Sequence, residues 1–259
     1  MSVFGKDFAF VYNDHWSAWT RDRAWPFLRN LVRERFSHAR SWLDLCCGSG
    51  WLLKFAGREG FETFGVDRSR HQLQWARKNA PKARLICADV RNYSLDRQVD
   101  VITCTFDSLN YLMRKNDLLR ALRTARRHLD AAGVFVFDMN TYEGLQDAWR
   151  HTSAMHEKDW TTIMVSSFNA KTAIGCVEIT GFVREGRLYR KFVERHEERG
   201  YRTAEIDDLL TRAGFRFRKR DGVTLGRPRK RSPRLLYICQ HAARPGASTR
   251  KRESTGERP

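Results

Sequence analysis

The sequence predicts an α/β fold in which helices cover both faces of a mostly parallel β-sheet. Apolar, strand-like runs alternate with helix-like segments, a glycine-rich turn follows the first run, and an aspartate stands at or near the end of each of the first three runs. The alternating segments cover residues 41–46, 51–58, 61–66, 70–79, 83–88, 99–106, 116–129 and 132–138. The 259 residues are enough for one such domain with an insertion.

The N-terminal segment before this pattern is predicted to be helical. Its apolar residues recur near helical spacing between Trp16 and Phe36. Pro26 is expected to separate two short helices there, because proline lacks a backbone donor and clashes with the preceding helical turn.

The pattern changes between about residues 150 and 200. Strand-like runs at 161–168, 173–183 and 188–194 are joined by short turns, which predicts successive antiparallel strands. We interpret this stretch as a β-rich insertion rather than as an independent domain.

The α/β pattern resumes after the insertion. Thr203 is expected to cap a helix that ends near Gly214. The runs 215–218 and 235–239 are expected to be the last two strands, antiparallel neighbours at one edge of the sheet. One domain is therefore predicted over residues 1–241, followed by a basic tail, 242–259, that lacks apolar periodicity and is predicted to be disordered.

The formal net charge is +18, and a large part of the arginine and lysine lies after Phe215. Such a basic surface makes nucleic acid a conceivable partner. We favour the simpler interpretation of solvated surface arginines, because much of this charge falls in or near the tail.

The composition also bears on compartment and on metals. No stretch approaches the roughly 18–20 apolar residues of a membrane span, and the first residues lack the architecture of a signal peptide, so we expect a cytoplasmic protein. The sequence contains no Cys-x-x-Cys motif and no nearby pair of histidines, so it does not predict a metal site. Four of the six cysteines lie in apolar runs and are expected to be reduced core residues: Cys46, Cys87, Cys104 and Cys239.

The most informative stretch is the turn from Asp44 to Gly50, Asp-Leu-Cys-Cys-Gly-Ser-Gly. A glycine turn between a strand and a helix presents unpaired backbone N–H groups, and its glycines let the main chain pass close to a ligand. Leu53 stands where the dinucleotide fingerprint has its third glycine, which argues against a pyrophosphate. Asp44 would repel a pyrophosphate and suits a cationic amino group.

Two further aspartates follow strand-like runs. Asp67 ends the second run, about 20 residues after the glycine turn, where a carboxylate can accept both hydroxyls of a ribose. Asp89 ends the third run, where its side chain can reach an adenine amino group. The alternative for each aspartate is that it merely caps the helix after its strand.

The set of strand-end carboxylates around this glycine turn resembles the class I S-adenosylmethionine-dependent methyltransferases, over most of the chain. The resemblance implies a Rossmann-like sheet of seven strands, S-adenosylmethionine as the cofactor, and an N-terminal helical lid over residues 1–38. It places cofactor contacts at Asp44, Cys46, Gly48, Ser49, Gly50, Asp67, Arg68, Asp89, Val90 and Phe106.

The segment after the fourth strand bears on the class of molecule that accepts the methyl group. Methyltransferases of nucleobase amines commonly show Asn/Asp-Pro-Pro-aromatic here, whereas this chain has Phe106-Asp107-Ser108-Leu109. The sequence of this segment resembles that of the bacterial small-molecule branch of the family, which includes amino-sugar N-methyltransferases. In that branch a β-rich insertion can shape the acceptor pocket or form a dimer contact, so a monomer or a homodimer through the insertion is expected.

We therefore expect a methyltransferase that acts on a small-molecule amine or hydroxyl. Transfer from a sulfonium needs mainly alignment and exclusion of water, but the acceptor must lose a proton. Candidate bases are Tyr12, His15 and His196, and period-2 spacing places His196 and Glu198 on one strand face. Alternatives are an RNA or protein methyltransferase that uses the basic surface, an NAD-dependent oxidoreductase, and a catalytically silent partner subunit.

Overall fold

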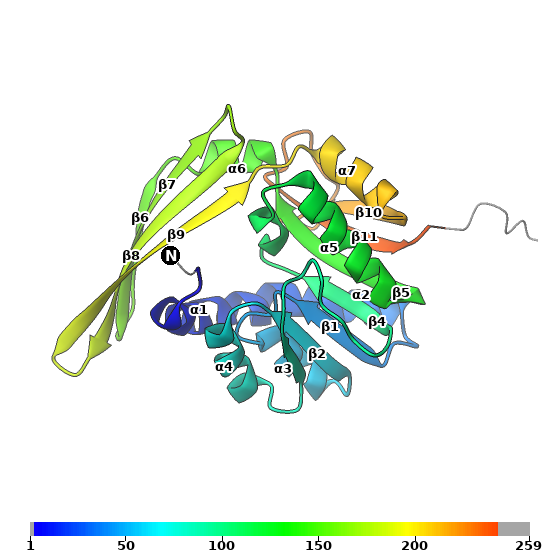
Figure 1. Cartoon of the computed structure of the whole chain (residues 1–259), viewed down its shortest axis with the longest axis horizontal. Helices are drawn as coiled ribbons and strands as arrows, with labels where there is room; N and C mark the ends of the chain where they lie inside the picture. Colours follow the sequence, from blue (N-terminus) through cyan, green and yellow to red (C-terminus); the bar gives the residue numbers. More distant parts are fainter. Residues whose placement is uncertain (1–2, 243–259) are drawn as a thin grey trace, which may run out of the picture.

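A computed structural model of the chain describes residues 3–242, apart from the side chains of residues 16 and 17. Seven strands form the central sheet in the order β10-β11-β5-β4-β1-β2-β3 (Figure 1). Strands β1 to β5 pair in parallel, and β11 is antiparallel to both β5 and β10, so the predicted mostly parallel sheet is confirmed. The strands are β1 (Ser41–Leu45), β2 (Glu62–Asp67), β3 (Arg84–Cys87), β4 (Val99–Cys104), β5 (Leu129–Asn140), β10 (Phe215–Asp221) and β11 (Arg234–His241).

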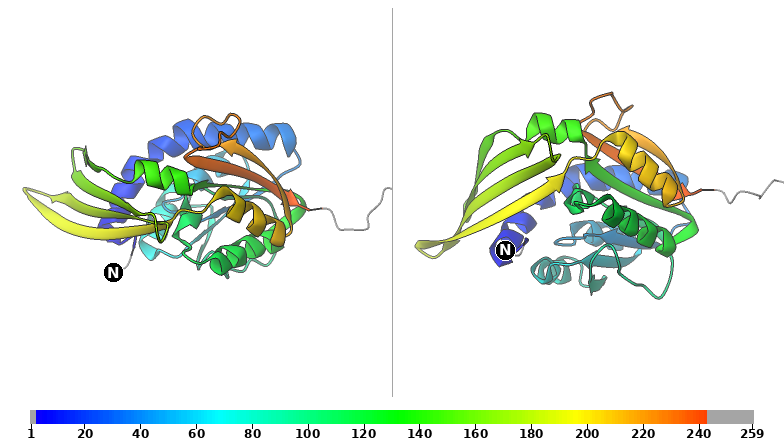
Figure 2. Two further views of the ribbon diagram at one scale, coloured as in Figure 1. Left: turned by 90° about the horizontal axis from the view of Figure 1, so that it is seen from above. Right: turned by 45° about the horizontal axis from the view of Figure 1, so that its top comes forward.

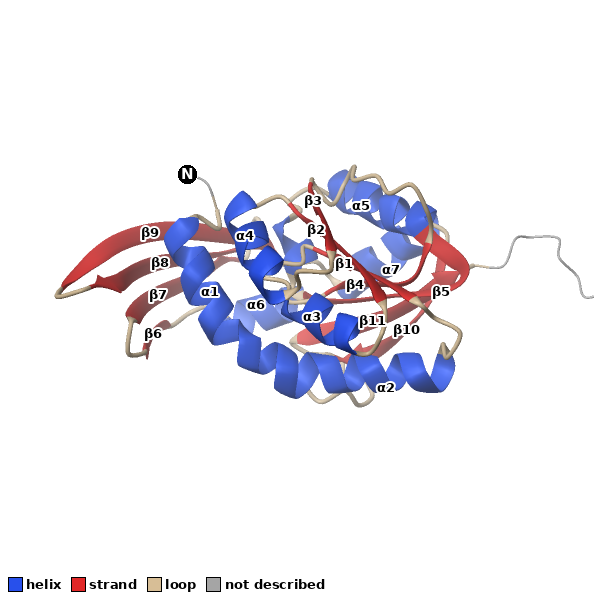
Figure 3. Cartoon of the chain, turned by 90° about the horizontal axis from the view of Figure 1, so that it is seen from below, coloured by secondary structure: helices blue, strands red, loops and turns tan. Residues whose placement is uncertain are grey.

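Helices cover both faces of this sheet, as Figure 3 shows for α2 and α5 on opposite sides. Alternate residues of β1 and β4 belong to different core clusters: Leu43 and Ile102 pack with α5 and α7, whereas Trp42 and Val101 pack with α2 and α3. This two-residue period is what a strand buried on both faces requires. The helices are α1 (Lys6–Trp19), α2 (Trp25–Arg35), α3 (Trp51–Arg58), α4 (Arg70–Asn79), α5 (Lys115–His128), α6 (Tyr142–Ala148) and α7 (Thr203–Arg212).

The N-terminal helices differ in detail from the prediction. A π-helical segment, η1 (Thr20–Ala24), joins α1 to α2, and Pro26 lies in the first turn of α2 rather than between two helices. A proline is tolerated there because the first backbone N–H groups of a helix have no partner within it. The break in α-helical geometry therefore precedes the proline.

The insertion is a second, antiparallel sheet in the order β6-β7-β8-β9, between α6 and α7. Its strands are β6 (Thr152–His156), β7 (Trp160–Asn169), β8 (Ile174–Glu185) and β9 (Leu188–Arg199). β6 was not predicted, because its short sequence has little apolar alternation. Figure 2 shows this sheet extending away from the central one. A homodimer formed through it stays a prediction.

Two local predictions are corrected. Arg202, not Thr203, is the N-cap of α7, and the Glu205 carboxylate accepts a hydrogen bond from the Arg202 backbone N–H at 2.8 Å. All six cysteines are free, but Cys87 is exposed because it lies on the edge strand β3, and Cys46 is half-buried. Cys104 and Cys239 are buried as predicted.

None of the helices in residues 3–242 has the length and apolar character needed to cross a membrane. All but the first residue of the predicted basic tail, 242–259, lies outside the described residues.

Candidate active site

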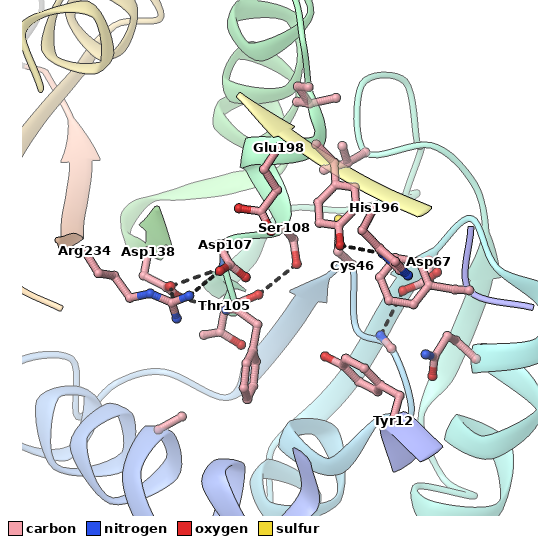
Figure 4. A pocket seen from close by; sticks show the side chains of 18 of the residues that line it. Tyr12, Cys46, Asp67, Thr105, Asp107, Ser108, Asp138, His196, Glu198 and Arg234 are labelled. Carbon is pink, nitrogen blue, oxygen red and sulfur yellow. Dashed lines mark hydrogen bonds and ion pairs between the residues drawn. The ribbon is translucent and has the colours of Figure 1, made fainter. Parts of the chain in front are cut away.

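A cavity of about 770 Å³ lies at the carboxyl ends of the central strands. Its wall combines the N-terminal helices, the ends of β1, β2, β4 and β5, the start of β11, and the inner face of the insertion sheet (Figure 4). Parallel strands bring their carboxyl ends to one edge of a sheet, which is why residues distant in sequence meet here.

The two glycines of the turn have different roles. Gly48 borders the cavity in left-handed backbone geometry (φ +51°), and a Cβ there would lie 3.1 Å from the Tyr12 ring. Gly50 is also left-handed (φ +77°) but packs on α4, since a Cβ there would lie 2.9 Å from the Cα of Ala76. Gly48 therefore allows the turn to pack against Tyr12 at the cavity, whereas Gly50 allows α3 and α4 to pack closely.

Asp44 is buried behind the turn. Its Oδ1 accepts a hydrogen bond from the Thr103 hydroxyl at 2.7 Å. Burial raises the pKa of Asp44 to about 7, despite that hydrogen bond. The residue borders a small hollow beside the main cavity, which Ser49 and Tyr12 also line. A cation in this hollow would favour the ionised carboxylate.

Asp67 lies in the wall at the end of β2 (Figure 4). Its Oδ2 accepts the Gly48 N–H at 2.9 Å and its Oδ1 accepts the Ser69 N–H at 2.8 Å. Burial raises its pKa, whereas these backbone donors lower it. Each carboxylate oxygen keeps acceptor capacity for a ligand hydroxyl. Arg68 follows in the wall with an exposed side chain.

Asp89 and Val90 form the next part of the wall. The Arg91 guanidinium binds both oxygens of Asp89, at 2.8 Å each, and also lies 3.2 Å from Asp117. Its hydrogen bonds lower the pKa of Asp89. The sequence pattern had not indicated this arginine, which holds the carboxylate at the cavity edge.

The turn after β4 has two successive non-glycine residues in left-handed geometry, Phe106 (φ +62°) and Asp107 (φ +49°). Such residues cost of order 1–3 kcal/mol each and persist only where the surroundings hold them. Asp138, buried at the end of β5, accepts the backbone N–H groups of Phe106 at 2.9 Å and Asp107 at 3.2 Å. The ring centroids of Phe106 and Trp19 lie 4.2 Å apart, and this contact holds the Phe106 ring in the cavity wall.

Two carboxylates pair with one guanidinium beside this turn, and a third carboxyl is linked to them through Asn140. Arg234, at the start of β11, pairs with Asp107 and with Asp138, the latter at 3.0 Å. Asn140 donates to Asp107 at 2.5 Å and to Glu198 at 3.0 Å. Glu198 is almost fully buried, and burial together with the charge of Asp107 raises its pKa well above its usual value. This part of the wall therefore has more carboxyl groups than cationic groups.

A second chain of contacts runs through His196. Its Nδ1 lies 2.9 Å from the Tyr111 hydroxyl, and its Nε2 lies 3.0 Å from Oε2 of Glu194. Glu194 also accepts the backbone N–H groups of Phe4 at 2.8 Å and Gly5 at 2.6 Å. An ionised carboxylate only accepts hydrogen bonds, so Nε2 of His196 carries the hydrogen and Nδ1 accepts from Tyr111.

The three candidate bases are thus separated by the structure. Tyr12 and His196 lie in the cavity wall (Figure 4). Burial, together with nearby aspartates, raises the pKa of Tyr12, so its phenol is neutral. His15 is exposed on α1, where its ring contacts Trp160 instead of lining the cavity. Arg234 and Tyr111 had no short-range signal and are found only through tertiary contacts, whereas the period-2 spacing that groups His196 with Glu198 also covers Glu194.

A family model described as a methyltransferase domain matches residues 43–133. The chain is 29% identical over 202 residues to the dTDP-3-amino-3,4,6-trideoxy-alpha-D-glucopyranose N,N-dimethyltransferase of Streptomyces venezuelae, covering 77% of this chain and 85% of that protein.

Two solved structures are similar over nearly the whole chain. One is an S-adenosylmethionine-dependent methyltransferase from Clostridium acetobutylicum ATCC 824, with a TM-score of 0.81 and 28% identity, covering 92% of this chain and 98% of the other. The second is DesVI of Streptomyces venezuelae, with a TM-score of 0.75 and 26% identity, covering 91% and 96%.

Proposed function

Because the chain is an S-adenosylmethionine-dependent methyltransferase, we propose that it methylates the amino group of a small molecule. The observation that carries this proposal is the acidic part of the cavity wall, formed by Asp107 and Asp138, which pair with Arg234, and by Glu198, which Asn140 links to Asp107.

The strand-end residues fit the cofactor. Asp44 would hold its cationic amino group, Asp67 its ribose hydroxyls, and Asp89 with Val90 its adenine, while Gly48 borders the same cavity without a side chain. When bound, this cofactor supplies a methyl carbon on a cationic sulfur, with a neutral thioether as the leaving group. Phe106 and Tyr12 would line the site of transfer and exclude water from it.

An ammonium group is the acceptor that suits the acidic wall best. Glu198 is buried and its carboxyl faces the cavity, so a cation nearby would restore its ionised form. A neutral hydroxyl would gain only a hydrogen bond at the same place, and an anion would be repelled.

The hydrogen-bonded residues Tyr111, His196 and Glu194 offer a path for a proton. An ammonium group must lose this proton before its nitrogen can attack the methyl carbon. The acceptor nitrogen would pass a proton to the Tyr111 oxygen while the Tyr111 hydroxyl hydrogen moves to Nδ1 of His196. Glu194 would stabilise the resulting imidazolium through Nε2. Glu198 is the second possible acceptor of this proton. His15, which is exposed, has no part in the proposal.

Relatives support the same acceptor chemistry. The name of the Streptomyces venezuelae enzyme specifies a dTDP-linked amino sugar as the molecule that it methylates on nitrogen. We therefore place nucleotide-linked and free amino sugars first among the acceptors to test. No observation favours the basic surface as an acceptor site, because the exposed Arg216, Arg218 and Arg220 of β10 lie outside the cavity wall.

The test is a comparison of matched acceptors. The protein is incubated with S-adenosylmethionine and with pairs of sugars that differ only in an amino or a hydroxyl group at one carbon, and the products are measured by mass spectrometry. We expect methylation of an amino sugar and not of its hydroxyl partner. Equal transfer to both, or transfer only to the hydroxyl, would contradict the proposal.

A matched variant tests the acidic wall itself. Glu198→Gln keeps the shape and removes the charge, so it should raise the KM for the amine while the affinity for the cofactor stays nearly unchanged. A rise in KM that also appears for a neutral acceptor would point to altered packing instead.

A further inference from the structure

Gln72 is a buried amide with no hydrogen-bond partner for its side chain. It lies in the first turn of α4 and is 1% exposed. Neither its Nε2 nor its Oε1 has a partner among the described residues, although its backbone N–H donates to the Ser69 hydroxyl at 3.3 Å. The residue lines the same cavity as Asp67, which makes the unused amide a candidate for binding a ligand.

A purely structural role does not explain this residue. Burying an amide without a partner destabilises the folded protein, and an apolar side chain of similar shape would avoid that cost. The wall of the same cavity also contains apolar aromatic side chains, Phe4 and Phe8, so a buried polar group is not a general requirement of this wall. A polar residue in this position is explained if a ligand supplies the missing hydrogen bonds.

The chemistry of Gln72 complements that of Asp67. The Asp67 carboxylate accepts hydrogen bonds and cannot donate them, and each of its oxygens already accepts one backbone N–H. A pair of neighbouring hydroxyls has two hydrogens to donate and two oxygens that accept. Asp67 can bind the hydrogens, but the hydroxyl oxygens need a donor, which the amide Nε2 supplies.

We propose that Gln72 is a further cofactor-binding residue, whose side-chain amide hydrogen-bonds the ribose hydroxyls of S-adenosylmethionine beside Asp67. The proposal rests on the placement of the ribose at Asp67 and is independent of the acceptor. The proposal explains why the Gln72 amide has no partner among the described residues of the ligand-free protein. In this proposal Gln72 lowers the stability of the ligand-free protein and raises its affinity for the cofactor.

The experiment uses Gln72→Met, which has nearly the same length and no hydrogen-bonding group. Affinity for S-adenosylhomocysteine is measured by calorimetry, and thermal unfolding is measured without ligand. We expect about tenfold weaker binding together with an unchanged or higher unfolding temperature. The matched control is Gln74→Met, an exposed glutamine on the same helix, which should change neither value.

Ribose-modified ligands identify the contact. Gln72→Met should weaken binding of the 2′-deoxy or the 3′-deoxy analogue of S-adenosylhomocysteine much less than binding of the parent, because the partner hydroxyl is already absent. An equal loss for parent and both analogues would overturn the proposal. So would unchanged affinity, which would mean that Gln72 holds only water, or a lower unfolding temperature with unchanged affinity, which would mean a packing role.

These outcomes separate the proposal from the proposed function. The binding measurements contain no acceptor, so failure to methylate an amine leaves the Gln72 result intact. Conversely, a native protein that methylates amino sugars while Gln72→Met binds the cofactor normally would overturn only this inference.

Discussion

The Tyr111 hydroxyl lies 2.9 Å from Nδ1 of His196, although the two residues are 85 positions apart. Tyr111 ends η2 (Ser108–Tyr111), the short helix after β4, and His196 lies in β9 of the insertion. Phe4 packs against both rings, at centroid distances of 5.8 and 5.1 Å. The insertion and the N-terminal segment therefore complete the site that the central sheet begins.

This contact predicts a loss of turnover when it is broken. Tyr111→Phe and His196→Gln each remove the proposed path for the proton, so kcat should fall by about 10²–10⁴ at neutral pH, with cofactor affinity nearly unchanged. Because both act in one path, the double variant should lose no more than the larger single loss. Additive losses in steady-state kinetics would show that the residues act separately.

Asp67→Ala is expected to weaken cofactor binding at least tenfold. A hydrogen bond to a charged group contributes about 1.5–3 kcal/mol, and this carboxylate also holds the Gly48 and Ser69 N–H groups in place. Calorimetry with S-adenosylhomocysteine measures the effect. Unchanged affinity would remove Asp67 from the binding site.

Cofactor affinity should depend on pH through Asp44. Burial raises the pKa of this carboxyl to about 7 in the free protein. Binding a cationic amino group requires the ionised form, so affinity should rise with pH up to about 7 and then level off. Binding below that pH should release a proton, which calorimetry in buffers of different ionisation enthalpy detects. Asp44→Asn should abolish the pH dependence; its persistence in that variant would assign it to another group.

The raised pKa of Asp44 affects folding stability in the opposite direction, because here stability falls as the pH rises. Between the ordinary pKa of an aspartate and about 7, the folded protein binds more protons at Asp44 than the unfolded chain does. Stability conferred by this residue is therefore lost as pH rises through that interval. Denaturant unfolding of the native protein and Asp44→Asn across pH 4–7 should show this slope only in the native protein.

Gly50→Ala should reduce stability more than it reduces binding. A Cβ there would clash with the backbone of Ala76 at 2.9 Å and would also occupy left-handed geometry. Gly60 is the matched control, because it has the same handedness (φ +90°) with nothing within 4 Å of an added Cβ. We expect Gly60→Ala to cost about 1 kcal/mol of unfolding free energy and Gly50→Ala several times as much. Equal costs in denaturant unfolding would show that α4 moves aside.

The central sheet was predictable because its signals are local. The glycine turn and the aspartates at the ends of β1, β2 and β3 mark strand ends in any chain of this type, and apolar alternation marks the strands themselves. β6 escaped detection because a short strand with little apolar character resembles a loop. Pro26 was misplaced because a π-helical segment has no clear sequence signature.

Half of the proposed site followed from the same local signals. The sequence was sufficient for the fold class, the cofactor and the strand-end carboxylates, since each depends on residues close together in the chain. It was not sufficient for the partners of those residues. Arg234 beside Asp107 and Glu194 beside Phe4 are contacts across 127 and 190 positions. Such contacts arise only when the sheet, the insertion and the N-terminal helix pack together, because burial and charge depend on neighbours in space rather than on neighbours in sequence.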